Sequence, residues 1–286
     1  MTDDIPLAGR PIPIDLLIIG GITVDDLAGW GEAAGGAARY ATEAALAVGL
    51  RVALHTVAGE EPVVREALDG LAAHADVIRH PAPSSIRFEH HGTDDARRLR
   101  LRGATGPIQV SEPDRLPVTA AVLFAPVAGE VAADAVQAVQ APFRAAGLQG
   151  WLRRTDPDGW VMTRPLAELE PGLAAALRGL DLLIASHHDL ASFDGPSALV
   201  QLRAWAGPRP QLVVTAGTEG AWLDDGVGPA SHVRAEVVEG PHTIGAGDAF
   251  AAVLVARRGA GRALRDAAED AASATATYLA TRTPPG

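Results

Sequence analysis

The sequence predicts a three-layer α/β/α sandwich with a mostly parallel central sheet, and two observations lead to this fold class. Short apolar runs without polar alternation recur along the chain, which is the pattern of strands buried on both faces. Longer segments with apolar residues at helical spacing separate these runs. Strands that alternate with helices in this order form a parallel sheet covered by helices on both sides.

The elements can be placed in order along the chain. Strands are expected at 14–19, 52–57, 121–124, 148–152, 182–185 and 212–215. Helices are expected at 36–48, 62–73, 131–146, 166–180, 198–206, 246–258 and 263–281. Gly49 directly follows the first helix and Pro62 opens the second, positions in which these residues favour helix ends and starts. Because no linker or repeat interrupts the alternation, we expect a single domain over residues 1–286.

One segment departs from this alternation. Residues 84–103 form two short β-rich stretches around Gly92–Asp95, which predicts a hairpin inserted between α/β units. Such a hairpin can close over a site as a lid, or it can pair with its copy in a homodimer. The arginines of Arg97–Arg102 alternate along the second stretch, which indicates a solvated strand face.

Composition excludes several kinds of chemistry. The chain has no cysteine, so disulfides and thiolate nucleophiles are absent. Its 24 basic residues are all arginine, which also excludes a P-loop lysine and a Schiff-base lysine. The formal net charge of −11 argues against a nucleic-acid partner. No apolar run approaches the roughly 20 residues of a membrane span, and the N-terminus is acidic, so we expect a cytoplasmic protein.

The segment Gly245–Asp248 carries the strongest chemical signal and opens the predicted helix 246–258. Small residues let backbone N–H groups approach a ligand, and a helix N-terminus attracts anions. The carboxylate of Asp248 would repel a phosphate that is merely bound. It suits a base that takes the proton of an attacking hydroxyl while the N–H groups stabilise the transferred phosphoryl group. The alternative is a glycine turn with an aspartate that stabilises the helix dipole.

Residues 242–250 resemble the signature of the PfkB, or ribokinase-like, family of carbohydrate kinases. This signature is Asp-Thr-x-Gly-Ala-Gly-Asp-x-Phe, and every fixed position except the first matches. Three further landmarks follow the family order: Gly20–Asp25 resembles the first strand with its substrate aspartate, Gly35–Gly36 the paired glycines, and Thr215–Ala221 the nucleotide-binding loop. The resemblance implies a ribokinase-like fold and ATP-dependent phosphorylation of a hydroxyl on a small sugar or cyclitol.

The resemblance also implies roles for the matched residues. The base would be Asp248, and the anion hole would be formed by Gly245, Ala246 and Gly247. Substrate hydroxyls would be held by Asp25, Gly35 and Gly36, although Asp25 is alternatively an ordinary turn residue. The ATP, with Mg²⁺ bridging its phosphates, would lie among Thr215, Gly217 and Gly220.

Three positions depart from the family pattern. His242 replaces the first aspartate of the signature, which in many relatives helps to hold a monovalent cation, so activation by such a cation is in doubt. Tyr40 takes the place nearest to the family's asparagine. The motif Asn-x-x-Glu appears as Ser186–Asp189, where Asp189 would bind a metal through water. These changes keep a second class of function open, a ligand sensor on the kinase fold.

Two segments bear on the acceptor. Gln149–Val161 resembles the myo-inositol-kinase-like branch, as does the Gly-Gly-x-x-x-Tyr pattern, and this resemblance brings Arg153 to the substrate pocket. Arg153 is alternatively an exposed charge at a strand end. Glu130 also follows a strand, where it can accept a substrate hydroxyl or stabilise a helix start. A nucleoside kinase is the second enzyme hypothesis, with Tyr40 and the residues around Phe88 as a slot for the base.

Two histidine pairs, His90–His91 and His187–His188, raise the question of a metal site. Neighbours on a strand point to opposite faces, and no cysteine completes a ligand pattern. We therefore expect surface histidines. The expected partners are a small polyol and ATP.

Overall fold

The computed structural model describes residues 14–27, 29, 31–92, 98–110, 116–192, 194–236, 238 and 243–282. A nine-stranded sheet forms its centre, in the order β15-β14-β13-β12-β9-β8-β1-β4-β5. The strands are β1 (Ile14–Ile19), β4 (Val52–Ala58), β5 (Asp76–Pro81), β8 (Thr119–Phe124), β9 (Phe143–Gly147), β12 (Leu182–Ser186), β13 (Gln211–Thr215), β14 (Ala221–Asp224) and β15 (Ser231–Val233). Neighbours from β13 to β5 are parallel, and only β14 and β15 pair antiparallel, which confirms the predicted fold class.

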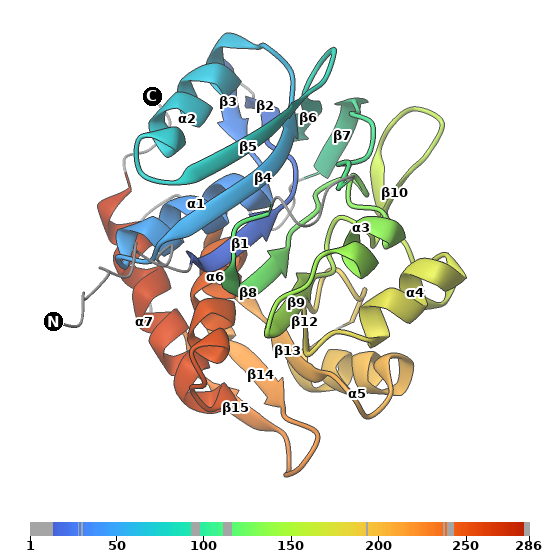
Figure 1. The fold of residues 1–286 in the computed structure, drawn as a ribbon. Helices are drawn as coiled ribbons and strands as arrows, with labels where there is room; N and C mark the ends of the chain where they lie inside the picture. Colours follow the sequence, from blue (N-terminus) through green and yellow to red (C-terminus); the bar gives the residue numbers. More distant parts are fainter. Residues whose placement is uncertain are drawn as a thin grey trace, which may run out of the picture.

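Helices cover both faces of this sheet (Figure 1). One face carries α1 (Ala37–Ala47), α2 (Pro62–Ala72), α6 (Ala246–Gly259) and α7 (Leu264–Thr281), and the other carries α3 (Ala133–Ala138), α4 (Pro171–Arg178) and α5 (Gly195–Ala206). The side chains of β1 alternate between the two cores: Leu16 and Ile18 pack on the first face, Leu17 and Ile19 on the second. Within the described residues, no helix combines the length and the apolar character that crossing a membrane requires.

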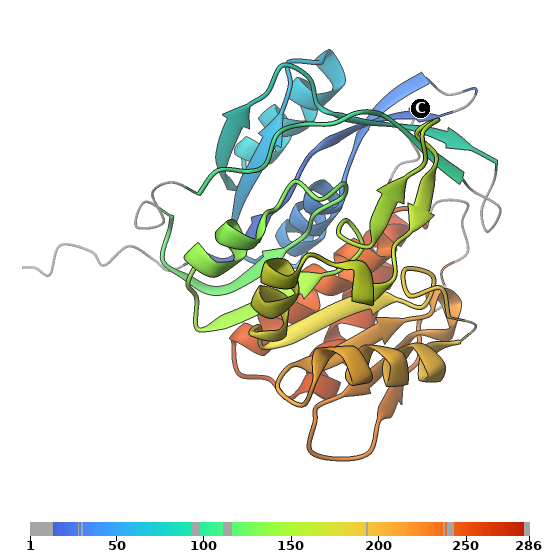
Figure 2. The same ribbon diagram turned by 90° about the vertical axis from the view of Figure 1, so that its right-hand side faces the viewer.

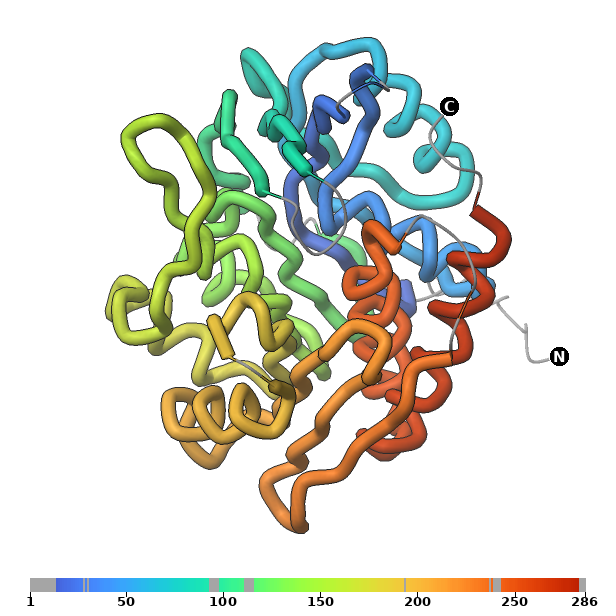
Figure 3. Tube along the Cα trace, turned by 180° about the vertical axis from the view of Figure 1, so that it is seen from behind, coloured from blue at the N-terminus to red at the C-terminus, as the bar shows by residue number. Residues whose placement is uncertain are grey.

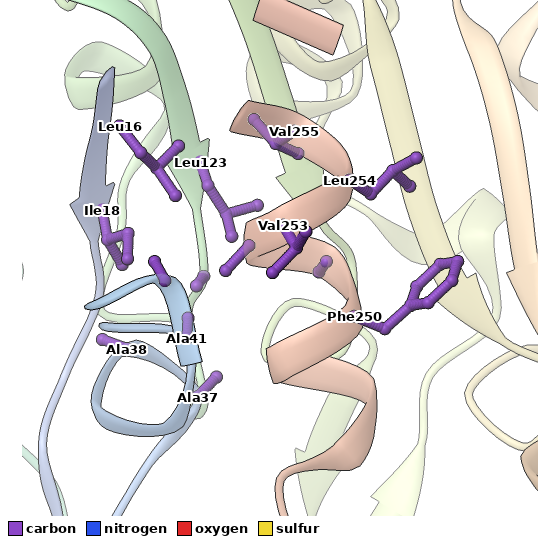
Figure 4. Packing of buried hydrophobic residues seen from close by; sticks show 14 of the residues in the cluster. Leu16, Ile18, Ala37, Ala38, Ala41, Leu123, Phe250, Val253, Leu254 and Val255 are labelled. Atoms are coloured by element: carbon purple, nitrogen blue, oxygen red, sulfur yellow. The ribbon is translucent and has the colours of Figure 1, made fainter. Parts of the chain in front are cut away.

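The helix α6 is buried along most of its length. Every residue from Ala249 to Ala256 is buried. Figure 4 shows Val253 on the side of α6 that faces Leu123 of the sheet, and Ala37, Ala38 and Ala41 of α1 belong to the same cluster. A helix that is apolar on all sides is held by the core rather than by its surface. This packing fixes the N-terminal end of α6, where Asp248 lies.

A second, four-stranded sheet has the order β3-β2-β6-β7. The predicted hairpin is present as β6 (Ile86–His91) and β7 (Arg98–Gly103). Two strands that were not predicted, β2 (Thr23–Leu27) and β3 (Gly31–Gly35), extend it, because β2 pairs in parallel with β6.

A short hairpin of β10 (Arg153–Thr155) and β11 (Val161–Thr163) reaches this second sheet (Figure 2). The N–H of Leu101 donates to the carbonyl of Gly159 at 2.8 Å, and the guanidinium of Arg100 donates to the carbonyl of Asp158 at 2.7 Å. The loop between β10 and β11 therefore joins the main body to β7.

One part of the predicted element order is wrong. The expected helix 131–146 ends at Ala138, and its last residues belong to β9; the expected strand 148–152 is a turn. Pro142 cannot donate a helical hydrogen bond, so the helix cannot continue through it. The stretch 143–147 is rich in alanine, which favours helices in isolation. Here it is a central strand between β8 and β12, and α6 packs against it.

Candidate active site

The predicted site residues gather at the carboxyl edge of the parallel strands. Gly21 follows β1, Glu130 follows β8 and Arg153 follows β9. Asp189 follows β12 and Gly217 follows β13. Because parallel strands all end on the same side, the topology alone brings these distant segments together, at the edge where α/β proteins bind their ligands.

A pocket lies at this edge, lined also by strands of the second sheet. It contains about 470 Å³ of empty space, part of which is open to solvent. The predicted residues that line it are Asp25, Gly36, Tyr40, Arg153, Gly245 and Asp248. The other lining residues are Thr23, Ala37, Phe88, His90, Leu99, Val127, Gln149 and Ile244.

Asp25 is buried and firmly held on β2. The hydroxyl of Thr23 donates to one carboxylate oxygen at 2.8 Å, and the Nε2 of His90 lies 3.5 Å from the other. Gly35, on the paired strand β3, lies against the same carboxylate: a Cβ at this position would be only 2.1 Å from Oδ2 of Asp25. Gly35 does not line the pocket itself, but its lack of a side chain makes room for Asp25. A fixed carboxylate of this kind can accept hydrogen bonds from ligand hydroxyls.

Gly36 lets α1 begin at the wall of the pocket. Its φ of +100° is a conformation that glycine adopts readily, and a Cβ would be 2.6 Å from the carbonyl oxygen of Gly21. The first residues of α1 then line the pocket, among them Ala37 and Tyr40.

The N-terminus of α6 presents free backbone donors. Gly245 caps the helix with a φ of +84°, and the N–H of Ala246 donates to the carbonyl of Thr243 at 3.0 Å. Among the described residues, the N–H groups of Gly247 and Asp248 have no acceptor. A Cβ at Gly247 would meet no atom of the described residues within 4 Å. Of the three predicted anion-hole residues, Gly247 offers its N–H, whereas that of Ala246 is occupied.

Asp248 lies in the first turn of α6, and its carboxyl is a weaker acid than that of an ordinary aspartate. Burial raises the pKa of its carboxyl to about 7; the guanidinium of Arg153 opposes this rise, and the carboxylate of Asp189 adds to it. A group with this pKa changes its protonation state near neutral pH, which suits a general base.

Arg153 supplies the countercharge of the pocket. It is partly buried, donates to the carbonyl of Val127 at 3.0 Å, and its guanidinium carbon lies 5.4 Å from the ring centroid of Phe88. Burial lowers the pKa of Arg153, while Asp189, Asp248, Asp25 and Glu130 act in the opposite direction. The alternative of an exposed charge at a strand end is therefore excluded.

Glu130 is buried, but it does not line the pocket. Its carboxylate accepts the backbone N–H groups of Gly21 at 2.7 Å, Val127 at 2.9 Å and Ala128 at 2.8 Å. These bonds join the loop after β1 to the loop after β8. The geometry therefore gives Glu130 a role in holding loops rather than the hydroxyl-acceptor role that was one of its two interpretations.

Asp189 forms a tight turn after β12. Its Oδ2 accepts the N–H of Ser186 at 2.9 Å, and its own N–H donates to the Ser186 hydroxyl at 3.0 Å. In the part of the chain that the structure describes, no group of three or more histidine or carboxylate side chains could hold a metal. Mg²⁺ in kinases is commonly held by one or two carboxylates together with water and substrate phosphates. Asp189, whose charge acts on Asp248, fits that smaller donor set.

The predicted nucleotide loop follows β13. Thr215 ends this strand in register with Ser186, so the loop lies beside the turn that holds Asp189. Gly217, with a φ of +56°, is exposed, and a Cβ there would meet no atom of the part of the chain that the structure describes within 4 Å. At Gly220 a Cβ would be 2.1 Å from the carbonyl oxygen of Val233, so only glycine fits. His242 lies outside the described residues.

The expectation that both histidines of the first pair lie at the surface is wrong for His90. Its side chain is 11% exposed and lines the pocket, whereas the side chain of His91 points outward on the same strand. Strand alternation could have indicated this, because Phe88 and His90 must share one face of β6 and His91 the other.

The chain resembles known proteins in sequence and in fold. The model of the family described as "pfkB family carbohydrate kinase" matches residues 124–285, more than half of the chain. No curated protein sequence matches the chain.

Solved structures share the fold. A pyrophosphate-dependent kinase in the ribokinase family, complexed with a pyrophosphate analog and myo-inositol, superposes with a TM-score of 0.75 at 18% identity, over 92% of this chain and 94% of that one. Ribokinase from Cryptococcus neoformans var. grubii serotype A, in complex with ADP, gives 0.70 at 17% identity, over 96% of each chain. Adenosine kinase from Sinorhizobium meliloti gives 0.68 at 20% identity, over 92% and 93%. The family match, on a fold with this edge site, shows that the chain belongs to the pfkB family of carbohydrate kinases, phosphotransferases whose acceptor is an alcohol group.

Proposed function

We propose that the chain transfers the terminal phosphoryl group of ATP to a hydroxyl of a small neutral polyol, a cyclitol or a monosaccharide. The observation that carries this proposal is Asp248: a carboxyl with a pKa of about 7, in the first turn of α6, facing a pocket beside backbone N–H groups that have no acceptor among the described residues. Asp25 in the same pocket offers an acceptor for the hydroxyls of the substrate.

In the proposed reaction each of these residues has a separate role. Asp25 orients the acceptor, and Asp248 takes the proton of the attacking hydroxyl as its oxygen bonds to the γ-phosphorus and the bond to the bridging oxygen of ADP breaks. The N–H groups of Gly247 and Asp248 stabilise the charge on the transferred phosphoryl group. Bound Mg²⁺ would neutralise charge on the donor phosphates, with Asp189 as the residue that holds it through water. Arg153 offsets the carboxylates around it.

The pocket favours a polyol over a nucleoside. A nucleoside base needs an aromatic face on which to stack, but the two rings of the pocket are already in contact with cations. The Phe88 ring faces Arg153 at 5.4 Å, and the Tyr40 ring faces Arg282 at 4.5 Å. The carboxylates of Asp25 and Asp248 also disfavour an acceptor that is itself an anion.

We also propose that the second sheet acts as a lid of the site within a single domain. It contributes Asp25, Phe88, His90 and Leu99 to the pocket, from three of its four strands. A sheet that supplies several walls of the pocket must be in place for the acceptor to be enclosed.

The identity of the phosphoryl donor, ATP or pyrophosphate, also has to be tested. The open glycine loop at Gly217 supports a nucleotide, whereas a structural neighbour is described as pyrophosphate-dependent. Both donors are therefore offered, with Mg²⁺, to a panel of acceptors: myo-inositol, ribose, fructose and adenosine. We expect ATP with a cyclitol or a sugar to support the fastest turnover. Preference for adenosine would establish the nucleoside alternative, and preference for pyrophosphate would correct the donor.

Asp248→Asn tests the base directly, because it keeps the shape of the side chain and removes its basicity. We expect kcat to fall by about 10²–10⁴-fold. The matched control is Asp266→Asn, since Asp266 is the third residue of α7 as Asp248 is of α6, but is exposed outside the pocket. Undiminished turnover in Asp248→Asn would refute the assignment of the base. Tight binding of an acceptor with no turnover by the unchanged chain would favour a ligand sensor.

A further inference from the structure

Arg282, the residue that directly follows α7, contacts the turn before α6. Its guanidinium donates to the carbonyl of Ile244 at 2.5 Å. Ile244 precedes Gly245, the cap of α6, and both residues line the pocket. Asp248 lies within one helical turn of the peptide that Arg282 holds.

The same guanidinium also contacts Tyr40, the side chain that packs against this turn. Its central carbon lies 4.5 Å from the ring centroid of Tyr40, within the range of a cation–π interaction. Tyr40 in turn packs directly on Gly245, because a Cβ at Gly245 would be 2.5 Å from the ring carbon Cγ. One cation therefore touches both the wall of the acceptor pocket and the turn that begins the anion site.

The end of α7 that carries Arg282 is itself fixed to α1. The hydroxyl of Tyr278 donates to the carboxylate of Glu43 at 2.7 Å, and Arg39 pairs with the same carboxylate at 2.7 Å. Figure 3 shows the end of α7, in red, beside α1, in blue. Arg282 therefore extends from a rigid support.

We propose that Arg282 is a positioning residue that clamps the turn Ile244–Gly245 against Tyr40 and so sets where the N–H groups of α6 stand relative to the acceptor. The inference rests on the proposed function. A planar guanidinium can bond a carbonyl and cover a ring at the same time, which an ammonium group cannot do equally well. Displacement of catalytic groups by about 1 Å costs roughly 100-fold in rate.

The kinetic test compares Arg282→Ala and Arg282→Lys with Arg265→Ala. Arg265 lies on α7, the helix that precedes Arg282, and its partner Glu269 is exposed. We expect kcat/KM of Arg282→Ala to fall by about 10–100-fold, mainly in kcat, and Arg282→Lys to recover only part of this. Guanidinium ion at low millimolar concentration should restore part of the lost kcat in Arg282→Ala and leave the unchanged chain unaffected. A kcat within about twofold of the unchanged chain, or a loss without such rescue, would overturn the proposal.

A second readout does not depend on turnover. Amide hydrogen exchange of residues 243–248 should become faster in Arg282→Ala, and guanidinium should slow it again. Unchanged exchange in this segment would overturn the clamp. If the unchanged chain turns over no acceptor but Arg282→Ala still shows the change in exchange, the proposed function fails and the clamp stands. If Arg282→Ala does not fold, Arg282→Lys gives the same comparison, with faster exchange at 243–248 expected.

Discussion

Asp25 and Asp248 are two carboxylates in one pocket with contrasting surroundings. Asp25 receives the hydroxyl of Thr23 and lies beside His90, on a strand paired with the closely fitted Gly35. Asp248 stands at a helix end, where burial dominates and raises its pKa to about 7. Hydrogen bonds hold the first carboxylate in place, while loss of water makes the second a better proton acceptor. The same side chain thus suits binding in one position and proton transfer in the other.

The largest effect that separates the two carboxylates should be the dependence of the rate on pH. A base with a pKa of about 7 must lose its proton to act, so the rate should be constant above this pH. Well below it the rate should fall about tenfold per pH unit, so that at pH 5 it should be about 100-fold below the rate at high pH. The measurement is kcat against pH for the unchanged chain and for Asp248→Asn, whose small residual rate should lack this step. A step of the same position in the variant would assign the titration to another group.

Asp25→Asn should affect binding more than chemistry. Hydrogen bonds to a charged group contribute about 1.5–3 kcal/mol, so the KM for the acceptor should rise by roughly 10–100-fold while kcat changes little. Steady-state kinetics with the best acceptor measures both. If kcat falls as far as in Asp248→Asn with KM unchanged, the division of roles between the two carboxylates is wrong.

Gly35→Ala should reproduce a weaker form of the Asp25 defect. The new Cβ would stand 2.1 Å from Oδ2 of Asp25, so the carboxylate must move. Overpacking of this kind costs about 1–3 kcal/mol of stability, and KM should rise as well. Gly70→Ala is the matched control, since a Cβ at this position, in the last turn of α2, meets no described atom within 4 Å. Thermal unfolding and acceptor KM report the two effects, and equal behaviour of the two variants would contradict the proposed contact.

The smallest expected effect is on stability. In the folded chain the pKa of Asp248 is about 7, well above the 3.8 of a solvent-exposed aspartate, so the folded form loses stability as the pH rises between these values. Asp248→Asn removes that cost and should be more stable at pH 8, on the order of 1 kcal/mol, with the difference vanishing toward pH 4. Urea unfolding at both pH values measures it. The gain in free energy of unfolding of Asp248→Asn over the unchanged chain should be larger at pH 8 than at pH 4. A smaller gain at pH 8 would show that burial does not raise this pKa.

The parts of the fold that could be predicted depend on local pattern. The parallel strands and α6 have strong apolar signals, and their order along the chain determines the edge where Asp25, Arg153 and Asp248 meet. The prediction of a helix over residues 131–146 was wrong because the alanine-rich residues of β9 favour a helix when they are considered in isolation. Only the neighbouring strands, which are distant in sequence, make this segment a strand.

The parts of the site that escaped prediction depend on contacts between distant residues. Arg282 and Ile244 are 38 positions apart, and no spacing rule connects them. The bond between Tyr278 and Glu43 spans 235 positions. His90 is the exception, because its inward direction follows from the register of β6 alone.

The loop between β10 and β11 has a consequence for how the acceptor enters. It binds β7 through Gly159, while Arg153 at the base of the same hairpin contacts both Phe88 of the second sheet and Val127 of the main body. A rotation of the second sheet that opened the pocket would therefore displace the guanidinium of Arg153, which lowers the pKa of Asp248. Under the proposed function, a movement of the second sheet that opens the pocket would therefore also change the charge environment of Asp248, and with it the pKa of this carboxyl.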